Sequence, residues 1–264
     1  MTDPRIADFL DTLAAAPARA LLLDYDGTLA PFRVERDRAT PYEGVREALR
    51  RIIDRGRTRV VVISGRTLDE LRPLLGVEPP PELWGTHGWE RLEPGGAPSL
   101  RTLPLPATAA LADAARAVDT PELAERIEVK PAAVAVHVRG LPDGDAARVL
   151  ARARAAWEPL AAGAALVVHA FDGGLELRVS GWDKGDAVRS VLDGQPHGTA
   201  VAYLGDDTTD EDAFRALATL GEGGRVRGIG VLVRAKPRPS AAQARITPPD
   251  ELLAFLDRWG AAAG

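Results

Sequence analysis

Short runs of consecutive apolar residues alternate with amphipathic segments along most of this chain. Leucine, valine and isoleucine dominate residues 20–23, 59–63, 200–204 and 229–233, a pattern typical of strands buried on both faces of a parallel sheet. Between these runs, apolar positions recur at helical spacing. The expected helices span residues 41–55, 67–75, 183–193 and 211–220, with a last one after Thr247-Pro248-Pro249-Asp250. This alternation predicts an α/β fold with a parallel sheet.

Two of these helices carry clear start signals. Thr40 is a capping hydroxyl, Pro41 suits the first helical position and Glu43 follows three residues after the cap, so a helix is expected to begin at Pro41 and to stop at Gly56. Thr67-Leu68-Asp69-Glu70 is a second capping box after the strand that ends at Ile63.

The middle of the chain has a different pattern. An alanine-rich helix near 107–118 is followed by alternating runs at 126–130 and 134–138, a helix near 145–160, and two further strands at 165–171 and 175–179. Strict alternation is typical of antiparallel sheets with one exposed face. The α-β-β-α-β-β order predicts an inserted α+β domain of residues 105–179, within a core formed by residues 1–104 and 180–264.

Composition excludes several function classes. The 264 residues include 33 basic and 38 acidic side chains, a net charge of −5, and no cysteine. Disulfides, thiolate metal sites and a cysteine nucleophile are therefore excluded. No sustained basic run points to nucleic acid, and no apolar run is long enough to span a membrane. The N-terminal residues lack the pattern of a signal peptide, so a cytoplasmic protein is expected.

Acidic residues cluster where the predicted strands end. Asp24 and Asp26 follow the first strand, and Gly27 allows a sharp turn beside them. Further acids follow the strand 200–204, namely Asp206, Asp207 and Asp210. Ligands of open α/β sheets bind at the carboxyl ends of the strands. Because Mg²⁺ prefers oxygen ligands and neutralises neighbouring carboxylates, we expect a magnesium site at this edge.

An aspartate beside such a cation can serve as a nucleophile in phosphoryl transfer. Asp24 would then attack phosphorus, and Asp26 would act as general acid and base. The charge on the transferring phosphoryl group needs donors and cations. The candidates for that role are Thr28, Ser64, Lys184 and Mg²⁺.

Four motifs in order resemble those of haloacid-dehalogenase-like phosphatases. They are Asp24-Tyr25-Asp26-Gly27-Thr28, Ser64, Lys184-Gly185 and Gly205-Asp206-Asp207-Thr208-Thr209-Asp210. The resemblance implies a Rossmann-like core, with Mg²⁺ held by Asp24, the carbonyl of Asp26 and Asp206, assisted by Asp207 and Asp210. It also implies that Ser64 and Lys184 hold the phosphate, supported by Gly27 and Gly65, and that the inserted domain is a substrate-selecting cap.

Further segments are similar to those of trehalose-6-phosphate phosphatases. These are Gly85-Thr86-His87-Gly88-Trp89-Glu90, Glu128-Val129-Lys130, His137-Val138-Arg139 and Glu176-Leu177-Arg178. The resemblance implies that polar cap residues hold the sugar, first of all Glu128, Lys130 and Glu176. The further expected contacts are Arg66, His87, His137, Arg139 and Arg178. Tyr25 replaces a more usual apolar aromatic and is expected to point into the fold.

The resemblance implies Mg²⁺-dependent hydrolysis of trehalose 6-phosphate, the last step of trehalose biosynthesis. The charge and hydropathy of the chain predict that it binds neither nucleic acid nor membranes, and a monomer is expected. Alternatives are a phosphatase for sucrose 6-phosphate or a glycosyl-3-phosphoglycerate, a phosphomutase, and a domain that binds phosphosugars without catalysis. Polar residues on the alternating strands are also the ordinary exposed face of a half-buried sheet. His87 is equally compatible with a packing role.

Overall fold

The structure, a computed structural model, describes residues 3–120, 123–162, 165–171 and 173–263. It forms two compact units. The larger joins the chain up to Ser99 with the segment from Asp183 onward, and the smaller runs from Leu100 to Trp182. The predicted cap, residues 105–179, lies within the smaller unit.

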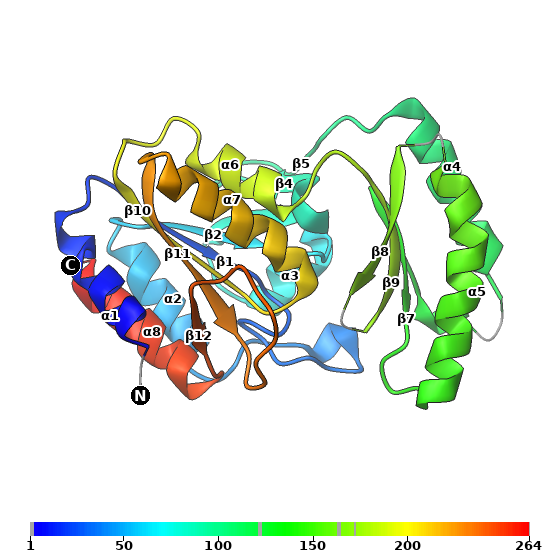
Figure 1. Ribbon diagram of the computed structural model, residues 1–264, viewed down its shortest axis with the longest axis horizontal. Coiled ribbons are helices and arrows are strands. Elements are labelled where there is room, and N and C mark those ends of the chain that lie inside the picture. The colour runs from blue at the N-terminus through cyan, green and yellow to red at the C-terminus, as the bar shows by residue number, and fades with distance from the viewer. Residues whose placement is uncertain (1–2, 121–122, 163–164, 172, 264) are drawn as a thin grey trace. The chain divides into compact units, whose positions relative to one another are not determined.

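The larger unit is built on one sheet with the strand order β12-β11-β10-β1-β2-β3-β4-β5 (Figure 1). The pairs from β12 to β3 are parallel, and β4 runs antiparallel to β3. The strands are β1 (Arg19–Leu23), β2 (Arg59–Ile63), β3 (Glu82–Gly85), β4 (Glu90–Leu92), β5 (Ser99–Leu100), β10 (Thr199–Gly205), β11 (Val226–Val233) and β12 (Ala244–Ile246). The predicted parallel α/β core is confirmed.

Helices cover both faces of this sheet. They are α1 (Pro4–Asp11), α2 (Val45–Asp54), α3 (Leu68–Leu75), α6 (Lys184–Leu192), α7 (Glu211–Glu222) and α8 (Asp250–Ala262). On one face, Leu21 of β1 shares a core with Leu49 of α2 and Phe255 of α8. On the other, the ring of Tyr203 in β10 meets Phe214 of α7 edge to face at 5.5 Å. Burial on both faces explains the uninterrupted apolar runs of the strands.

The two predicted helix starts had different outcomes. Thr67 caps α3 as predicted, since its Oγ1 accepts from the N–H of Glu70 at 3.4 Å. The predicted start at Pro41 is wrong, because α2 begins at Val45 after Gly44, whose φ is +85°. The N–H of Tyr42 instead donates to the carbonyl of Leu29 at 2.9 Å. This tertiary bond to the loop after β1 outweighs the local capping signal.

The smaller unit has the predicted α-β-β-α-β-β order. Its elements are α4 (Leu105–Val118), β6 (Ile127–Lys130), β7 (Ala133–His137), α5 (Asp143–Ala161), β8 (Leu166–Phe171) and β9 (Gly174–Val179). The sheet order is β6-β7-β9-β8 with antiparallel pairs, and α4 and α5 cover one face (Figure 1). Trp157 of α5 is buried there and donates its Nε1 proton to Ala114 of α4 at 3.0 Å. Among the described residues, no helix is long and apolar enough to cross a membrane.

Candidate active site

Three neighbouring strands end at one edge of the larger sheet and bring the first group of predicted residues together. β1 lies between β10 and β2 and is parallel to both. The residues that follow these strands are Asp206, Asp24 and Ser64, and all three are buried. The edge formed by the carboxyl ends of parallel strands is the usual ligand site of such sheets.

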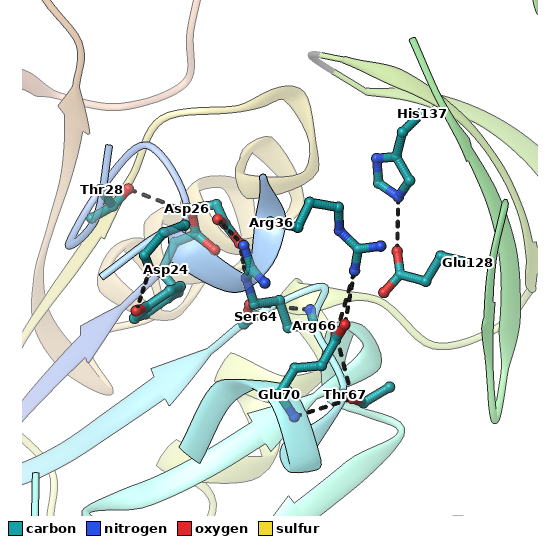
Figure 2. Close-up of polar contacts among 12 residues, drawn as sticks. Asp24, Asp26, Thr28, Arg36, Ser64, Arg66, Thr67, Glu70, Glu128 and His137 are labelled. Carbon is teal, nitrogen blue, oxygen red and sulfur yellow. Dashed lines mark hydrogen bonds and ion pairs between the residues drawn. The ribbon is translucent and has the colours of Figure 1, made fainter. Parts of the chain in front are cut away.

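Asp24 is in contact with the ammonium group of a lysine. Nζ of Lys184, the first residue of α6, is 2.6 Å from Oδ1 of Asp24, and Thr28 Oγ1 lies 3.5 Å from Oδ2 (Figure 2). Burial and the charge of Asp210 raise the pKa of Asp24 to about 7, although Lys184 opposes this shift. The carboxylate is therefore poised to ionise near neutral pH.

Lys184 bridges two aspartates. Its Nζ is also 2.7 Å from Oδ1 of Asp210. Burial alone would lower the pKa of Lys184, but the charges of Asp210 and Asp24 raise it above its ordinary value. The side chain is thus a permanent, fixed cation beside Asp24.

Asp210 is a hub of four hydrogen bonds. Its Oδ1 accepts from Lys184 and from the hydroxyl of Tyr203 at 2.6 Å. Its Oδ2 accepts from the backbone N–H groups of Asp206 at 2.9 Å and Asp207 at 3.0 Å. Because a carboxylate has about four lone-pair sites, Asp210 is saturated by these donors. It holds the loop after β10 in place rather than offering a lone pair to a ligand.

Sequence reasoning missed Tyr203. The residue is fully buried in β10, and burial together with the charge of Asp210 raises the pKa of its hydroxyl well above the ordinary value. Gly205 stands two residues further on the same strand, and a Cβ there would lie 2.3 Å from Cγ of Asp210. The available signal was a hydroxyl in an otherwise apolar strand, two residues before a glycine.

The acidic cluster has the donor set of a hard-cation site. Carboxylate oxygens of Asp24, Asp206 and Asp210 lie within 4.8 Å of one another. Oδ1 of Asp206 is buried and has no hydrogen-bond partner among the described residues. Burial and the charge of Asp24 raise the pKa of Asp206 well above its ordinary value. A cation would relieve this repulsion and satisfy the buried oxygen.

Gly27 makes room for this arrangement. Its φ is +81°, and a Cβ would lie 2.2 Å from Oδ2 of Asp206. Asp207, predicted as a metal residue, lies outside the cluster, since its Oδ1 accepts from the N–H of Thr208 at 2.6 Å. Asp210, expected only to assist, lies in the cluster beside Asp24 and Asp206, where its hydrogen bonds fix the loop. The assignment of Asp207 as a metal residue stays a prediction.

Arg66 forms a two-pronged ion pair with Asp26. Its Nε is 2.6 Å from Oδ2 and its Nη2 is 2.7 Å from Oδ1 (Figure 2). Nη1 of Arg66 is buried without a hydrogen-bond partner among the described residues. Planar guanidinium groups orient carboxylates in this bidentate geometry. The structure therefore places Arg66, predicted as a substrate contact, on the predicted acid and base.

Tyr25 points into the fold, as expected. It is fully buried, and its hydroxyl donates to the carbonyl of Ala39 at 2.7 Å. Its ring lies 5.7 Å from Cζ of Arg66, within the range of a cation–π contact. Tyr25, between Asp24 and Asp26, thus anchors the loop that follows β1.

In the smaller unit, the predicted sugar contacts share one face of the sheet. Lys130 of β6 lies between two acids, with Nζ 2.9 Å from Oε1 of Glu176 and 3.3 Å from Oε2 of Glu128. Nε2 of His137 is 2.9 Å from the same oxygen of Glu128 (Figure 2). Ala135 lies between Glu128 and Glu176 in the strand register, so no large side chain separates them. The face therefore carries a compact set of hydrogen-bonding groups.

Two other predicted cap contacts have different positions. Arg178 of β9 pairs with Ala133 of β7 on the same face as Glu176, and its Nε is buried without a hydrogen-bond partner among the described residues. Arg139 lies against Gly173, where a Cβ would be 2.5 Å from its Nε. Of the two arginines, only Arg178 lies on β9, the strand that carries Glu176.

The fold, a parallel α/β core interrupted by an α+β unit, is shared with a haloacid dehalogenase-like hydrolase from B. subtilis, at a TM-score of 0.56 and 15% identity over 90% of this chain and 97% of that one. The chain belongs to the trehalose-phosphatase family, whose family model matches residues 22–250. A trehalose-phosphate phosphatase of Mycobacterium avium is 34% identical, over 90% of this chain and 61% of that protein.

Other relatives extend this comparison. An uncharacterized glycosyl hydrolase of Mycobacterium tuberculosis is 34% identical over 90% of this chain but only 18% of its own length. The chain thus spans less than two thirds of these relatives. The solved C-terminal domain of the C. albicans trehalose-6-phosphate phosphatase shares the fold, with a TM-score of 0.81, 22% identity and coverage of 97% of this chain and 96% of that one.

Proposed function

We propose that this protein hydrolyses trehalose 6-phosphate to trehalose and phosphate, with Asp24 as nucleophile and Mg²⁺ as cofactor. The family membership supports the reaction class, and the contact of Lys184 with Asp24 at 2.6 Å carries the mechanism. A fixed cation at this distance favours the ionised form of the nucleophilic carboxyl against the effect of burial, and it orients the oxygen.

In the first step, an oxygen of Asp24 bonds to phosphorus while the bond from phosphorus to the sugar oxygen breaks. The leaving oxygen takes a proton from Asp26, and trehalose departs. Asp26 then takes a proton from water, whose oxygen attacks phosphorus and frees Asp24 and phosphate. The bidentate pair with Arg66 orients the ionised carboxylate of Asp26, which is the form that takes the proton from water in the second step.

The remaining donors of the site stabilise the phosphoryl group. Ser64 and Thr28 supply hydroxyls, Lys184 supplies positive charge, and Nη1 of Arg66 is available for a further oxygen. We propose that Mg²⁺ is held by Asp24, Asp206 and the carbonyl of Asp26. When bound, it neutralises the acidic cluster and withdraws charge from the phosphoryl group.

We further propose that Glu128, Lys130 and Glu176 bind the sugar hydroxyls. Their alternating charges and short contacts support this assignment, because carboxylates and ammonium groups accept from and donate to hydroxyls. We also propose that the protein is a cytoplasmic monomer. The net charge of −5 and the lack of a basic run in the sequence support the proposal that it has no nucleic-acid partner. Sedimentation of the purified protein tests the monomeric state.

The decisive experiment measures phosphate release from trehalose 6-phosphate, sucrose 6-phosphate, glucose 6-phosphate and glucosyl-3-phosphoglycerate, with Mg²⁺ and with EDTA. We expect EDTA-sensitive turnover that favours trehalose 6-phosphate, and its loss in Asp24→Asn with an unchanged circular dichroism spectrum. Preference for another substrate would overturn the sugar assignment but keep the chemistry. Turnover by Asp24→Asn would overturn the nucleophile.

A further inference from the structure

The turn of residues 85–90 is hydrogen-bonded to the loop that carries Ser64 and Arg66. The backbone N–H of Thr86 donates to the carbonyl of Arg66 at 2.7 Å, and that of His87 donates to the carbonyl of Ser64 at 2.8 Å. Thr86 thus reaches Arg66 while the next residue reaches back to Ser64, so both bonds lie outside the parallel register of β2 and β3, which ends at Ile63 and Trp84. The loop that carries Ser64 and Arg66 is thus held by hydrogen bonds from the turn of residues 85–90.

The turn holds a backbone conformation that its residues disfavour. Thr86 has a φ of +46° and His87 a φ of +55°, two consecutive non-glycine residues in the left-handed region. Such strain persists where surrounding contacts enforce it, and it concentrates at functional sites. Here the left-handed pair directs both N–H groups toward the neighbouring loop.

The imidazole of His87 lies directly on Gly65. A Cβ at Gly65 would be 2.7 Å from Cε1 and 2.9 Å from Nε2 of that ring. His87 is only 7% exposed, so the ring has little space into which to move. Because Gly65 does not have a positive φ, the ring, and not the backbone conformation, is what requires a glycine between Ser64 and Arg66.

Glu90 makes a third connection between the two segments. Its Oε2 accepts from Thr86 Oγ1 at 2.5 Å, and its carboxylate also accepts from the backbone N–H of Leu68, the first residue of α3. A Cβ at Gly85 would lie 2.9 Å from that same N–H. The turn of residues 85–90 therefore contacts Ser64 and Gly65 in the loop and Leu68 at the start of α3.

We propose that residues 85–90 form a clamp that positions Ser64 toward the phosphate and Arg66 toward Asp26, with His87 and Glu90 as positioning residues. This assignment rests on the proposed phosphatase activity and extends it. It replaces a sugar contact of His87 with a role exerted through the backbone of the Ser64 loop. Because Ser64 and Arg66 are proposed to act on the phosphoryl group and on Asp26, the clamp should affect the hydrolysis of every phosphate ester that binds at the core site.

The first test compares His87→Asn with the wild type on trehalose 6-phosphate and on p-nitrophenyl phosphate. Asparagine tolerates the left-handed conformation but has no ring to cover Gly65. We expect kcat/KM to fall about tenfold on both substrates, because the backbone bond is kept but the packed ring that positions the Ser64 loop is lost, and the inhibition constant of inorganic phosphate to rise. A loss confined to trehalose 6-phosphate would identify a sugar contact and overturn the clamp. The control is His197→Asn, since His197 is exposed.

The second test is a double-mutant cycle on the contact itself. Gly65→Ala should lower kcat/KM on both substrates in the wild type, because its methyl group meets the imidazole. The His87→Gly variant keeps the left-handed turn but has no ring. In this variant, adding Gly65→Ala should lower kcat/KM only slightly. Equal losses of Gly65→Ala in both backgrounds would overturn the contact as the cause.

A third measurement does not depend on activity. Hydrogen exchange of the backbone amides at residues 64–68 should accelerate in His87→Asn and in Glu90→Gln, at a temperature well below unfolding. Unchanged exchange in both variants would overturn the clamp. If the wild type hydrolyses only p-nitrophenyl phosphate, the substrate proposal fails while the clamp is still tested. If it hydrolyses neither ester, the exchange measurement alone decides.

Discussion

The hydroxyl of Tyr203 and the ammonium of Lys184 donate to the same oxygen of Asp210, at 2.6 and 2.7 Å. Asp210 in turn holds the backbone of the loop that presents Asp206. The buried Tyr203 therefore helps to fix both Lys184 and the acidic loop. Neither function is visible from the position of Tyr203 in an apolar strand.

Tyr203→Phe should lower kcat about tenfold, since one buried donor to a charged acceptor is lost. The ring and its packing on Phe214 are retained, so the protein should remain folded. Steady-state kinetics and thermal unfolding measure the two effects. Thr199→Val is the matched control, because it removes another buried hydroxyl of β10, bonded to the carbonyl of Pro196 at the other end of the strand. Equal kcat for the two variants would contradict the role of Tyr203.

Arg66→Lys should reduce kcat by about 10 to 100-fold while preserving the positive charge. An ammonium group is a point charge and cannot contact both oxygens of Asp26 in the planar fork that the guanidinium forms. The loss should appear on trehalose 6-phosphate and p-nitrophenyl phosphate alike, as measured by initial rates. Wild-type kcat in the lysine variant would show that charge alone suffices.

The sequence predicted the strands and helices whose pattern of apolar residues matches the faces that are buried in the fold. β2 spans the predicted residues 59–63, and the site residues follow the strands as expected, because parallel strands buried on both faces leave continuous apolar runs. Short β3, β4 and β12 were missed, since three or four residues carry too little periodicity. The start of α2 was wrong because Tyr42 makes a tertiary bond that no local pattern encodes.

At the site, the sequence motifs located the functional side chains but did not show which residues each one contacts. Asp24, Asp26 and Lys184 stand in recognisable order, whereas the pairing of Arg66 with Asp26 depends on how two loops approach in space. The motif likewise does not tell the positions of Asp207 and Asp210 apart. Both are acids after the same strand, and only the folded turn decides which carboxylate faces inward.

The stability of the metal-free protein should fall as pH rises through about 7. Burial raises the pKa of Asp24 from 3.8 in the unfolded chain to about 7 in the folded one. Between these values the folded state keeps a proton that the unfolded state releases, so the free energy of unfolding decreases with rising pH. The raised pKa of Asp206 acts in the same direction.

Thermal unfolding in EDTA at pH 5.5 and pH 8 checks this expectation. The wild type should melt at a lower temperature at pH 8, and Asp24→Asn should show a smaller difference between the two pH values. Added Mg²⁺ should raise the melting temperature more at pH 8, because the cation competes with the bound proton. A wild-type difference no larger than that of Asp24→Asn would show that the acidic cluster does not cause it.

Lys130→Ala should separate sugar recognition from phosphoryl chemistry. Lys130 lies between Glu176 and Glu128 at 2.9 and 3.3 Å, so its removal leaves two facing carboxylates without their cation and takes away a donor for sugar hydroxyls. Because sites built to hydrogen-bond a substrate lose discrimination steeply when a partner is missing, kcat/KM for trehalose 6-phosphate should fall by about 100-fold.

Hydrolysis of p-nitrophenyl phosphate by the same variant should stay near the wild-type rate, since this ester has no sugar hydroxyls. Arg148→Ala is the matched control, because Arg148 also belongs to the smaller unit but lies on α5 with a side chain 77% exposed. Equal losses on both esters would mean that Lys130 supports folding or phosphate binding instead. In that case the assignment of Glu128 and Glu176 to the sugar would lose its main support, because Lys130 is the cation that holds them together.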